Sequence, residues 1–183
     1  MKYIIRKIFY DFEKEEKWLN EMSAKGFALV DYSWCKYVFE DAPQGEYIYR
    51  LEFLEKPLNA PQSQEYIRFM EEAGAEFVDS YFRWVYFRRK ASEGEFDIYT
   101  DIDSRIKHYS RIRNLFLILA AVNFVVGMFN LMHGFYETSV GIFPANAYIS
   151  ILSFSLAALL TVFLILPLTQ KIGGLRKEKE IRG

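Results

Sequence analysis

The sequence contains little of the chemistry that catalytic and metal sites use. Its 183 residues include one cysteine, Cys35, and two histidines, His108 and His133. A single cysteine excludes an intrachain disulfide framework and a cysteine-only zinc site. No glycine-rich phosphate loop occurs, and no histidine lies near Cys35 in the sequence. We therefore predict that the protein is not an enzyme and has no catalytic, metal or cofactor-binding residues.

A second absence is that of charge in the C-terminal part of the chain. Residues 114–168 contain no lysine or arginine and a single acidic residue, Glu137. Residues 1–113 differ strongly, because they carry 18 basic and 21 acidic residues. An uncharged apolar block of this length excludes an ordinary soluble globule.

The apolar block contains two predicted membrane spans, residues 114–132 and residues 147–168. At a rise of about 1.5 Å per residue, these segments form helices about 28 and 33 Å long. Both lengths match a hydrocarbon core about 30 Å thick. The alternative is a pair of buried core helices, which would need amphipathic partners, and no such segment follows residue 113. We predict a two-helix transmembrane hairpin.

The distribution of basic residues predicts the orientation of this hairpin. The connecting segment, residues 133–146, has no lysine or arginine, whereas the tail, residues 169–183, has five. Basic residues also precede the first span. Because cytoplasmic segments of membrane proteins are rich in lysine and arginine, we predict an extracytoplasmic loop and two cytoplasmic termini.

Residues 97–113 are predicted to form an amphipathic juxtamembrane helix that leads into the first span. Ile98, Ile102 and Ile106 recur at four-residue spacing, and the acidic residues come first and the basic residues last. A basic end next to the inner leaflet is attracted to anionic lipid. The candidate lipid-contacting residues are Arg105, Lys107, Arg111 and Arg113.

Small and polar residues recur at helical spacing along both predicted spans. The candidates for packing between transmembrane helices are Asn123, Gly127, Ser153 and Ala157. Small residues let helix backbones approach closely, and a mid-membrane asparagine needs a hydrogen-bonding partner. We favour packing within the hairpin or in a homodimer, because no ionisable residue lies inside either span. The alternative is a substrate or ion path through Asn123.

Residues 1–96 have the pattern of a soluble α+β domain. Helices are expected after Asp11 and after residue 59. The long aromatic stretches 27–40, with a bend near Ser33, and 76–90 are each expected as one strand. The first helix carries acidic residues expected on a solvated face, namely Glu13, Glu15, Glu16 and Glu21.

An internal similarity supports this arrangement. When the sequence is shifted by 48 residues, the two helices, their terminal glycines Gly26 and Gly74, and the following aromatic strands coincide. The resulting order is β-α-β-β-α-β with two related halves. This order predicts a ferredoxin-like split fold.

The aromatic content of the soluble domain suggests a binding surface. Residues 1–113 hold 24 of the 33 aromatic residues, and strand alternation places Phe82, Trp84 and Tyr86 on one face. Helices cover one face of a two-layer domain, so we predict these three residues as a partner interface on the other face. Binding of a small ligand and cover by another part of the chain are the alternatives. The net charge of −3 in residues 1–113 argues against direct nucleic-acid binding.

Four segments resemble the bacterial domain-of-unknown-function 2812 family. They are FEKEEKWL at 12–19, KGF at 25–27, GEYIYRL at 45–51 and WVYFR at 84–88. Members are typical of Gram-positive bacteria, often have C-terminal membrane spans and often occur beside a PadR-like transcriptional regulator. The resemblance therefore implies a noncatalytic accessory or sensor that couples the bacterial cell membrane to a cytosolic partner, a PadR-like regulator. The alternative is a small-ligand-binding module or an accessory subunit of a membrane transporter.

Overall fold

The computed structural model describes residues 1–99 and 101–182. The chain divides into two compact units, Met1–Thr100 and Asp101–Gly183.

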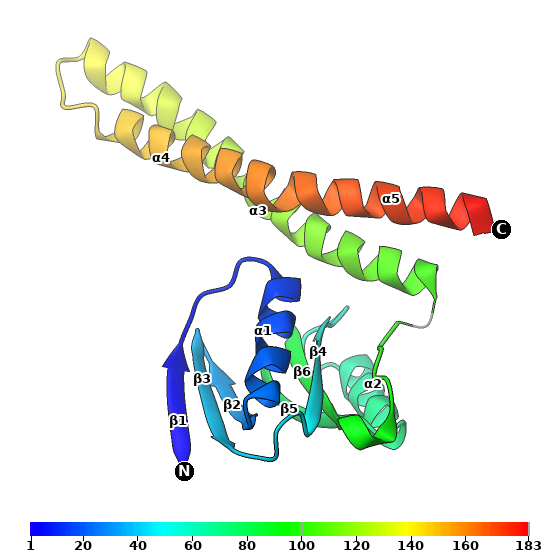
Figure 1. Ribbon diagram of the computed structural model, residues 1–183. Helices are drawn as coiled ribbons and strands as arrows, with labels where there is room; N and C mark the ends of the chain where they lie inside the picture. The colour runs from blue at the N-terminus through cyan, green and yellow to red at the C-terminus, as the bar shows by residue number, and fades with distance from the viewer. Residues whose placement is uncertain (100, 183) are drawn as a thin grey trace. The chain divides into compact units, whose positions relative to one another are not determined.

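The first unit contains two helices and six strands (Figure 1). In chain order they are β1 (Lys2–Arg6), α1 (Phe12–Ala24), β2 (Phe27–Ser33), β3 (Lys36–Asp41), β4 (Tyr47–Phe53), α2 (Pro61–Glu72), β5 (Glu76–Tyr81) and β6 (Trp84–Lys90), followed by a 3-10 turn, Ala91–Glu93. The strands form two antiparallel sheets of three, in the orders β1-β3-β2 and β4-β6-β5. This arrangement confirms the mixed α+β class.

The structure does not confirm the ferredoxin-like order. The observed order is β-α-β-β twice, because each of the two long aromatic stretches forms a hairpin of two strands. Trp34 and Cys35 make the first turn with φ values of 33° and 60°, and Phe82 lies in the second turn with a φ of 59°. Hairpin turns with positive φ normally contain glycine or asparagine, and neither turn does.

The two β-α-β-β halves are structural repeats. Leu29 pairs with Phe39 and Asp31 with Val38, and the same positions shifted by 48 residues, Phe77 with Phe87 and Asp79 with Tyr86, pair in the second sheet. Both pairings skip one residue at the same place, which makes an equivalent β-bulge in each half. The 48-residue similarity in the sequence therefore reflects a duplicated β-α-β-β unit.

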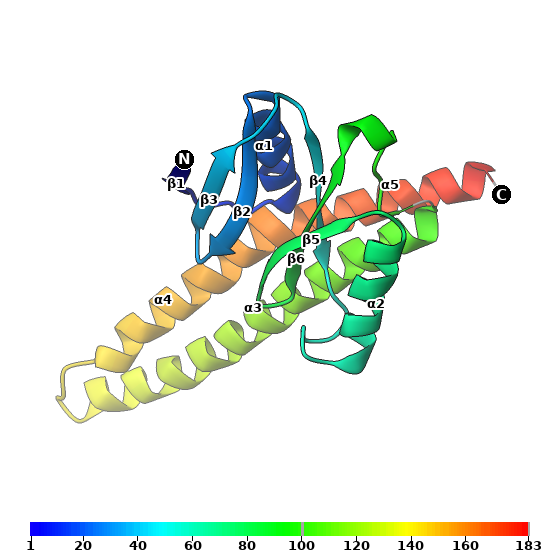
Figure 2. The same ribbon diagram turned by 90° about the horizontal axis from the view of Figure 1, so that it is seen from below.

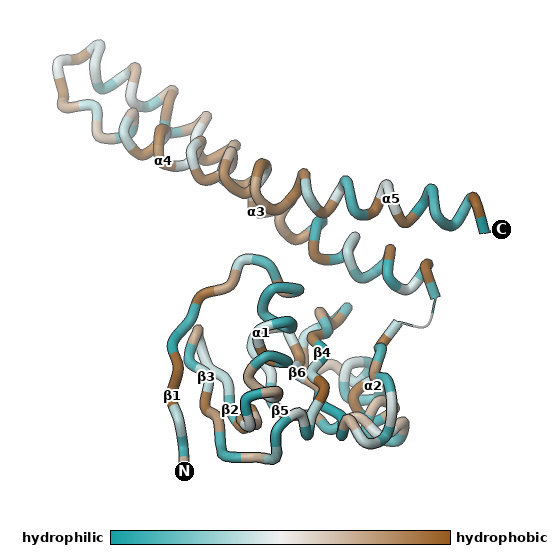
Figure 3. The backbone as a smooth tube through the Cα atoms, in the orientation of Figure 1, coloured by the Kyte–Doolittle hydropathy of each residue, from teal (hydrophilic) through white to brown (hydrophobic). Residues whose placement is uncertain are grey.

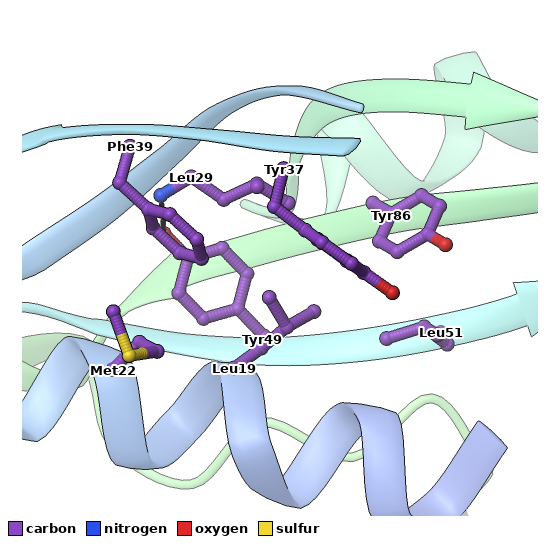
Figure 4. Packing of buried hydrophobic residues seen from close by; sticks show 8 residues of the cluster. All are labelled: Leu19, Met22, Leu29, Tyr37, Phe39, Tyr49, Leu51 and Tyr86. Carbon is purple, nitrogen blue, oxygen red and sulfur yellow. Dashed lines mark hydrogen bonds between the residues drawn. The ribbon is translucent and has the colours of Figure 1, made fainter. Parts of the chain in front are cut away.

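Helix α1 joins the two repeats. Its buried Leu19 and Met22 pack in one cluster with side chains from both sheets, including Phe39 of β3 and Tyr49 of β4 (Figure 4). The polar side of α1 satisfies the free backbone groups of β4: the Asn20 amide donates to the Tyr49 carbonyl at 3.1 Å and accepts from the Tyr49 amide at 2.8 Å. Side chains of α1 thus pair with the backbone groups of β4 that no neighbouring strand reaches at this edge of the sheet.

Helix α2 contributes to a second cluster. Ile67 and Met70 pack with Val85 and Phe87 of β6, on the face of that strand opposite Tyr86. Figure 2 shows α2 and α1 beside different parts of the strands. Strand β6 is therefore covered on both of its faces.

The second unit is a pair of long helices. Helix α3 runs without a break over Ile102–Ser139, and a second continuous helix of 38 residues comprises α4 (Ala145–Leu160), a π-helical turn η2 (Thr161–Ile165) and α5 (Leu166–Arg182). Both are long and apolar enough to cross a membrane. Hydrophobic residues predominate in α4 and in the adjoining half of α3 (Figure 3). Helix α3 begins five residues after the predicted start at residue 97, and the helices replace most of the predicted loop, residues 133–146.

Small residues let the two helices approach closely. A Cβ atom added to Gly134 would lie 2.6 Å from the backbone nitrogen of Ala147, and one added to Gly127 would lie 2.8 Å from the Phe154 ring. Near the opposite end of the pair, the Lys179 ammonium lies 2.8 Å from the Asp103 carboxylate. Contacts therefore join the helices at both ends.

Candidate functional site

The predicted partner interface does not exist as a shared exposed face. Tyr86 is buried, with 2% of its surface exposed, whereas Phe82 lies in the β5–β6 turn and is 67% exposed. Trp84 is half-buried, and its ring lies 5.3 Å from Phe12 and 5.0 Å from Phe53. The prediction was wrong in its geometry because it assumed that one face of this strand lacked cover.

The structure instead brings polar chemistry together around Glu15 in helix α1. Asp11 caps this helix, since its carboxylate accepts from the Glu13 backbone amide at 3.0 Å. Glu15 lies one turn before Leu19 and two turns before Met22, on the helix face that packs inward. The carboxylate is consequently buried, with 9% of the residue exposed.

Two tyrosines from different sheets donate hydrogen bonds to the same oxygen of Glu15. The hydroxyl of Tyr37 on β3 lies 2.7 Å from Oε1, and that of Tyr86 on β6 lies 2.6 Å from it. Figure 4 shows both tyrosine rings in the space between the sheets. Glu15 therefore connects α1 to both repeats.

A third tyrosine packs on the other two. The ring of Tyr32 on β2 is half-buried, and its centroid lies 4.7 Å from those of Tyr37 and Tyr86. Glu15, Tyr32, Tyr37 and Tyr86 are called here the tyrosine–carboxylate cluster. Trp18 borders this cluster. Its ring centroid lies 4.8 Å from that of Tyr37, and the two ring planes meet at 75°.

The cluster has no basic partner in the described part of the chain. Within residues 1–99 and 101–182, Glu15 forms no ion pair, and its Oε2 accepts no hydrogen bond. Burial raises the pKa of the Glu15 carboxyl, and the two tyrosine hydroxyls offset this in part. Burial and the charge of Glu15 raise the pKa of Tyr37 and of Tyr86, so both hydroxyls stay protonated donors.

The neighbouring Glu16 has a different environment. Its carboxylate lies 3.3 Å from the Arg50 guanidinium and accepts from the Leu51 backbone amide at 3.0 Å. Burial raises the pKa of Glu16, while Leu51 and Arg50 lower it. Two adjacent acids of one helix thus differ in whether a basic group balances their charge.

The second repeat contributes Tyr86 to the cluster but has no equivalent of Glu15, Tyr32 or Tyr37. A shift of 48 residues places Ser63 at the position of Glu15, Ser80 at that of Tyr32 and Val85 at that of Tyr37. Ser63 and Val85 are buried, and Val85 belongs to the second apolar cluster. The same β-α-β-β unit therefore packs without a carboxylate at this position.

Sequence reasoning placed Glu15 on a solvated face because it belongs to a run of acidic residues. The available signal was its helical spacing, since Glu15, Leu19 and Met22 fall on one side of an α-helix. The tyrosine partners gave no local signal, because they lie 22 and 71 residues further along the chain.

The predicted transmembrane packing residues fall into two groups. Gly127, Ser153 and Ala157 are buried in the helix pair. Asn123 is half-exposed, and its amide donates to the Leu119 carbonyl of its own helix at 2.9 Å.

The predicted lipid-contacting residues lie on the first turns of α3. Arg105 and Lys107 are exposed, and Arg111 and Arg113 are half-buried. The Arg113 guanidinium donates to the Asn114 side-chain oxygen at 3.0 Å. Lipid contact by these residues stays a prediction.

These features define a class: an α+β domain built from two β-α-β-β repeats, in one chain with two helices long and apolar enough to span a membrane. Residues 11–121 match the family described as "Protein of unknown function (DUF2812)", and the chain belongs to this family. The resemblance seen in the sequence is confirmed. Neither a curated protein nor a solved structure matches the chain.

Proposed function

We propose that this protein is a noncatalytic sensor anchored in the bacterial cell membrane. In this proposal the α+β domain binds a small ligand in the cytoplasm, and the two long helices hold the domain at the membrane. The observation that carries the proposal is the tyrosine–carboxylate cluster. A buried carboxylate without a basic partner is costly in free energy, and perturbed ionisable groups of this kind concentrate at functional sites.

The proposed output is contact with a cytosolic protein. Residues 11–121 match the family model, and the frequent neighbours of that family suggest a PadR-like transcriptional regulator as the partner. A homodimer is compatible with this role. An accessory subunit of a membrane transporter is the second candidate, supported by the two apolar helices.

Affinity purification distinguishes these partners. The tagged full-length chain would be isolated from gently solubilised native membranes, with a chain lacking residues 1–99 as the matched control. We expect a transcriptional regulator to be recovered with the full chain and lost with the control. Recovery of transporter subunits by both chains would contradict the sensor proposal and favour the second candidate.

The proposed orientation has its own experiment. Reporter proteins fused after residue 183 and within residues 140–144 would show on which side of the membrane each segment lies. We expect cytoplasmic activity for the first fusion and extracytoplasmic activity for the second, since the connecting segment lacks lysine and arginine. Extracytoplasmic activity at the C-terminus would contradict the orientation.

A further inference from the structure

The tyrosine–carboxylate cluster has a chemistry that specifies its ligand. We propose that Glu15, Tyr32, Tyr37 and Tyr86 bind an organic cation, namely a tertiary or quaternary ammonium group on an apolar body. This inference rests on the proposed function, which assigns ligand sensing to the α+β domain.

The first argument is the unbalanced charge. Glu15 forms no ion pair within the described residues, although 91% of its surface is removed from solvent. Two hydroxyl groups stabilise its carboxylate, but neither carries a positive charge. A bound cation would supply the counter-charge that the described chain does not.

The second argument concerns the kind of cation. Calcium needs six to eight oxygen ligands and magnesium an octahedral set, whereas this cluster offers one carboxylate. No group of three histidine, cysteine, aspartate or glutamate side chains suited to a metal occurs within residues 1–99 and 101–182. Aromatic rings, in contrast, bind ammonium groups over their faces, as in the recognition of choline and methyl-lysine.

The third argument is that a neighbouring ammonium group already packs on the aromatic rings that border the cluster. The Lys7 ammonium lies 4.8 Å from the centroid of Trp18 and 4.7 Å from that of Phe9. The Trp18 ring in turn lies 4.8 Å from Tyr37. The aromatic border of the cluster is therefore suited to a cation.

The fourth argument comes from the duplication. The equivalent positions of the second repeat hold serine and valine, and that repeat still forms a complete β-α-β-β unit. The fold thus does not require a carboxylate at the position of Glu15. A specific role for the first repeat explains why it carries one.

The route of entry follows from what covers the cluster. The segment between β1 and α1, residues 7–11, belongs to no helix or strand, and its Phe9 ring lies 6.3 Å from Tyr37 and 5.4 Å from Trp18. Ile8 and Tyr10 on either side are 80% and 63% exposed. Displacement of Phe9 would open the aromatic border to a ligand.

The test compares a cation with its neutral isostere. Benzyltrimethylammonium and neopentylbenzene differ in having nitrogen or carbon at the quaternary centre. Their binding to the full-length chain in nanodiscs of zwitterionic lipid would be measured by calorimetry, with empty nanodiscs subtracted. We expect the cation to bind at least tenfold more tightly than the isostere. Equal affinities, or no binding of the cation, would overturn the inference.

Two single-residue variants test the role of Glu15. Glu15→Gln keeps an oxygen that accepts from both tyrosines, so the domain should remain folded, but it removes the charge. We expect this variant to lose at least tenfold in affinity for the cation. The matched control is Glu16→Gln on the same helix, whose carboxylate already pairs with Arg50 and which should leave the affinity unchanged. Equal affinities of wild type and Glu15→Gln would overturn the inference.

Proton release gives a second readout. The titratable groups that face Glu15 are Tyr32, Tyr37 and Tyr86, and the neighbouring acid on its own helix, Glu16, is paired with Arg50 of β4. A cation favours ionised Glu15, so its affinity should rise with pH and protons should be released on binding. Calorimetry in two buffers of different ionisation enthalpy detects this release, which Glu15→Gln should abolish. If cation binding fails while a cytosolic regulator still co-purifies with the chain, the inference is wrong and the sensor proposal stands.

Discussion

Glu15 gives the stability of the α+β domain a particular dependence on pH. Burial raises the pKa of Glu15 in the folded state. The contribution of Glu15 to the free energy of unfolding is therefore complete below the ordinary glutamate pKa of about 4.3, and it is lost as the pH rises through the folded pKa. Glu15→Gln removes this titration and keeps the acceptor for both tyrosines. We expect the variant to be at least as stable as wild type at pH 8, with the difference shrinking toward pH 4, as measured by urea unfolding at both pH values.

The control for this prediction is Glu16→Gln. Removing the Glu16 charge also removes its pairing with Arg50 and its bond from the Leu51 amide, so this variant should lose stability at pH 8. A loss in Glu15→Gln as large as in Glu16→Gln would mean that the charge of Glu15 stabilises the fold.

Trp84 tests how well strand β6 is covered. Its ring packs between Phe12 and Phe53, so Trp84→Ala should lower the free energy of unfolding by about 3 kcal/mol, the lower end of the range for buried tryptophan. Phe82→Ala in the exposed turn should change it by less than about 0.5 kcal/mol. Chemical denaturation of both variants measures the difference. If Trp84→Ala were as neutral as Phe82→Ala, Trp84 would return as a candidate interface residue.

At the scale of elements, the β2–β3 turn has unfavourable residues for its backbone. Trp34 and Cys35 adopt positive φ, and Trp34 is 76% exposed. Left-handed backbone costs about 1–2 kcal/mol for ordinary residues. Replacing the pair with Asn-Gly should therefore raise the stability by about 1 kcal/mol, seen as a higher midpoint of urea unfolding. A lower midpoint would show that the ring contact between Trp34 and Tyr81 matters more than the backbone.

Gly134 determines how closely the two long helices approach. Its closest neighbour is the backbone of Ala147, which cannot rotate away, so Gly134→Leu should separate the helices at this end. Gly173→Leu is the control, because nothing lies within 4 Å of a Cβ at that position. Cysteine cross-linking between residues 127 and 154, which face each other in the helix pair, in a Cys35→Ser background should decrease in the first variant and persist in the second. Equal cross-linking would contradict the packing.

The sequence predicted the elements that have local signals. The Asp11 cap, the glycines after both helices and the two apolar helices all follow from residue type and spacing, and the structure contains each of them. The hairpins were missed because Trp34-Cys35 and Phe82-Arg83 carry none of the residues typical of tight turns. The 48-residue similarity was visible, but without the turns it was assigned to a ferredoxin-like split, which the structure does not confirm.

At the scale of the whole molecule, the α+β domain should fold without the long helices. Both of its apolar clusters are built from residues that precede Thr100. A chain of residues 1–99 should give a cooperative thermal transition by circular dichroism and a monomeric or dimeric species in solution. An unfolded spectrum at every concentration would mean that the domain needs residues beyond this boundary.

The duplication also has a consequence for synthesis on the ribosome. Each repeat pairs strands that are close in sequence, so the first sheet can form once β3 has emerged, and domains generally fold in the order of synthesis. At roughly 5–20 residues per second, β4 to β6 follow within about ten seconds. During that interval Tyr37 and Phe39 have no partners from the second sheet. Since both apolar helices are made last, a defect in their packing, such as that of Gly134→Leu, should leave the yield of folded α+β domain unchanged.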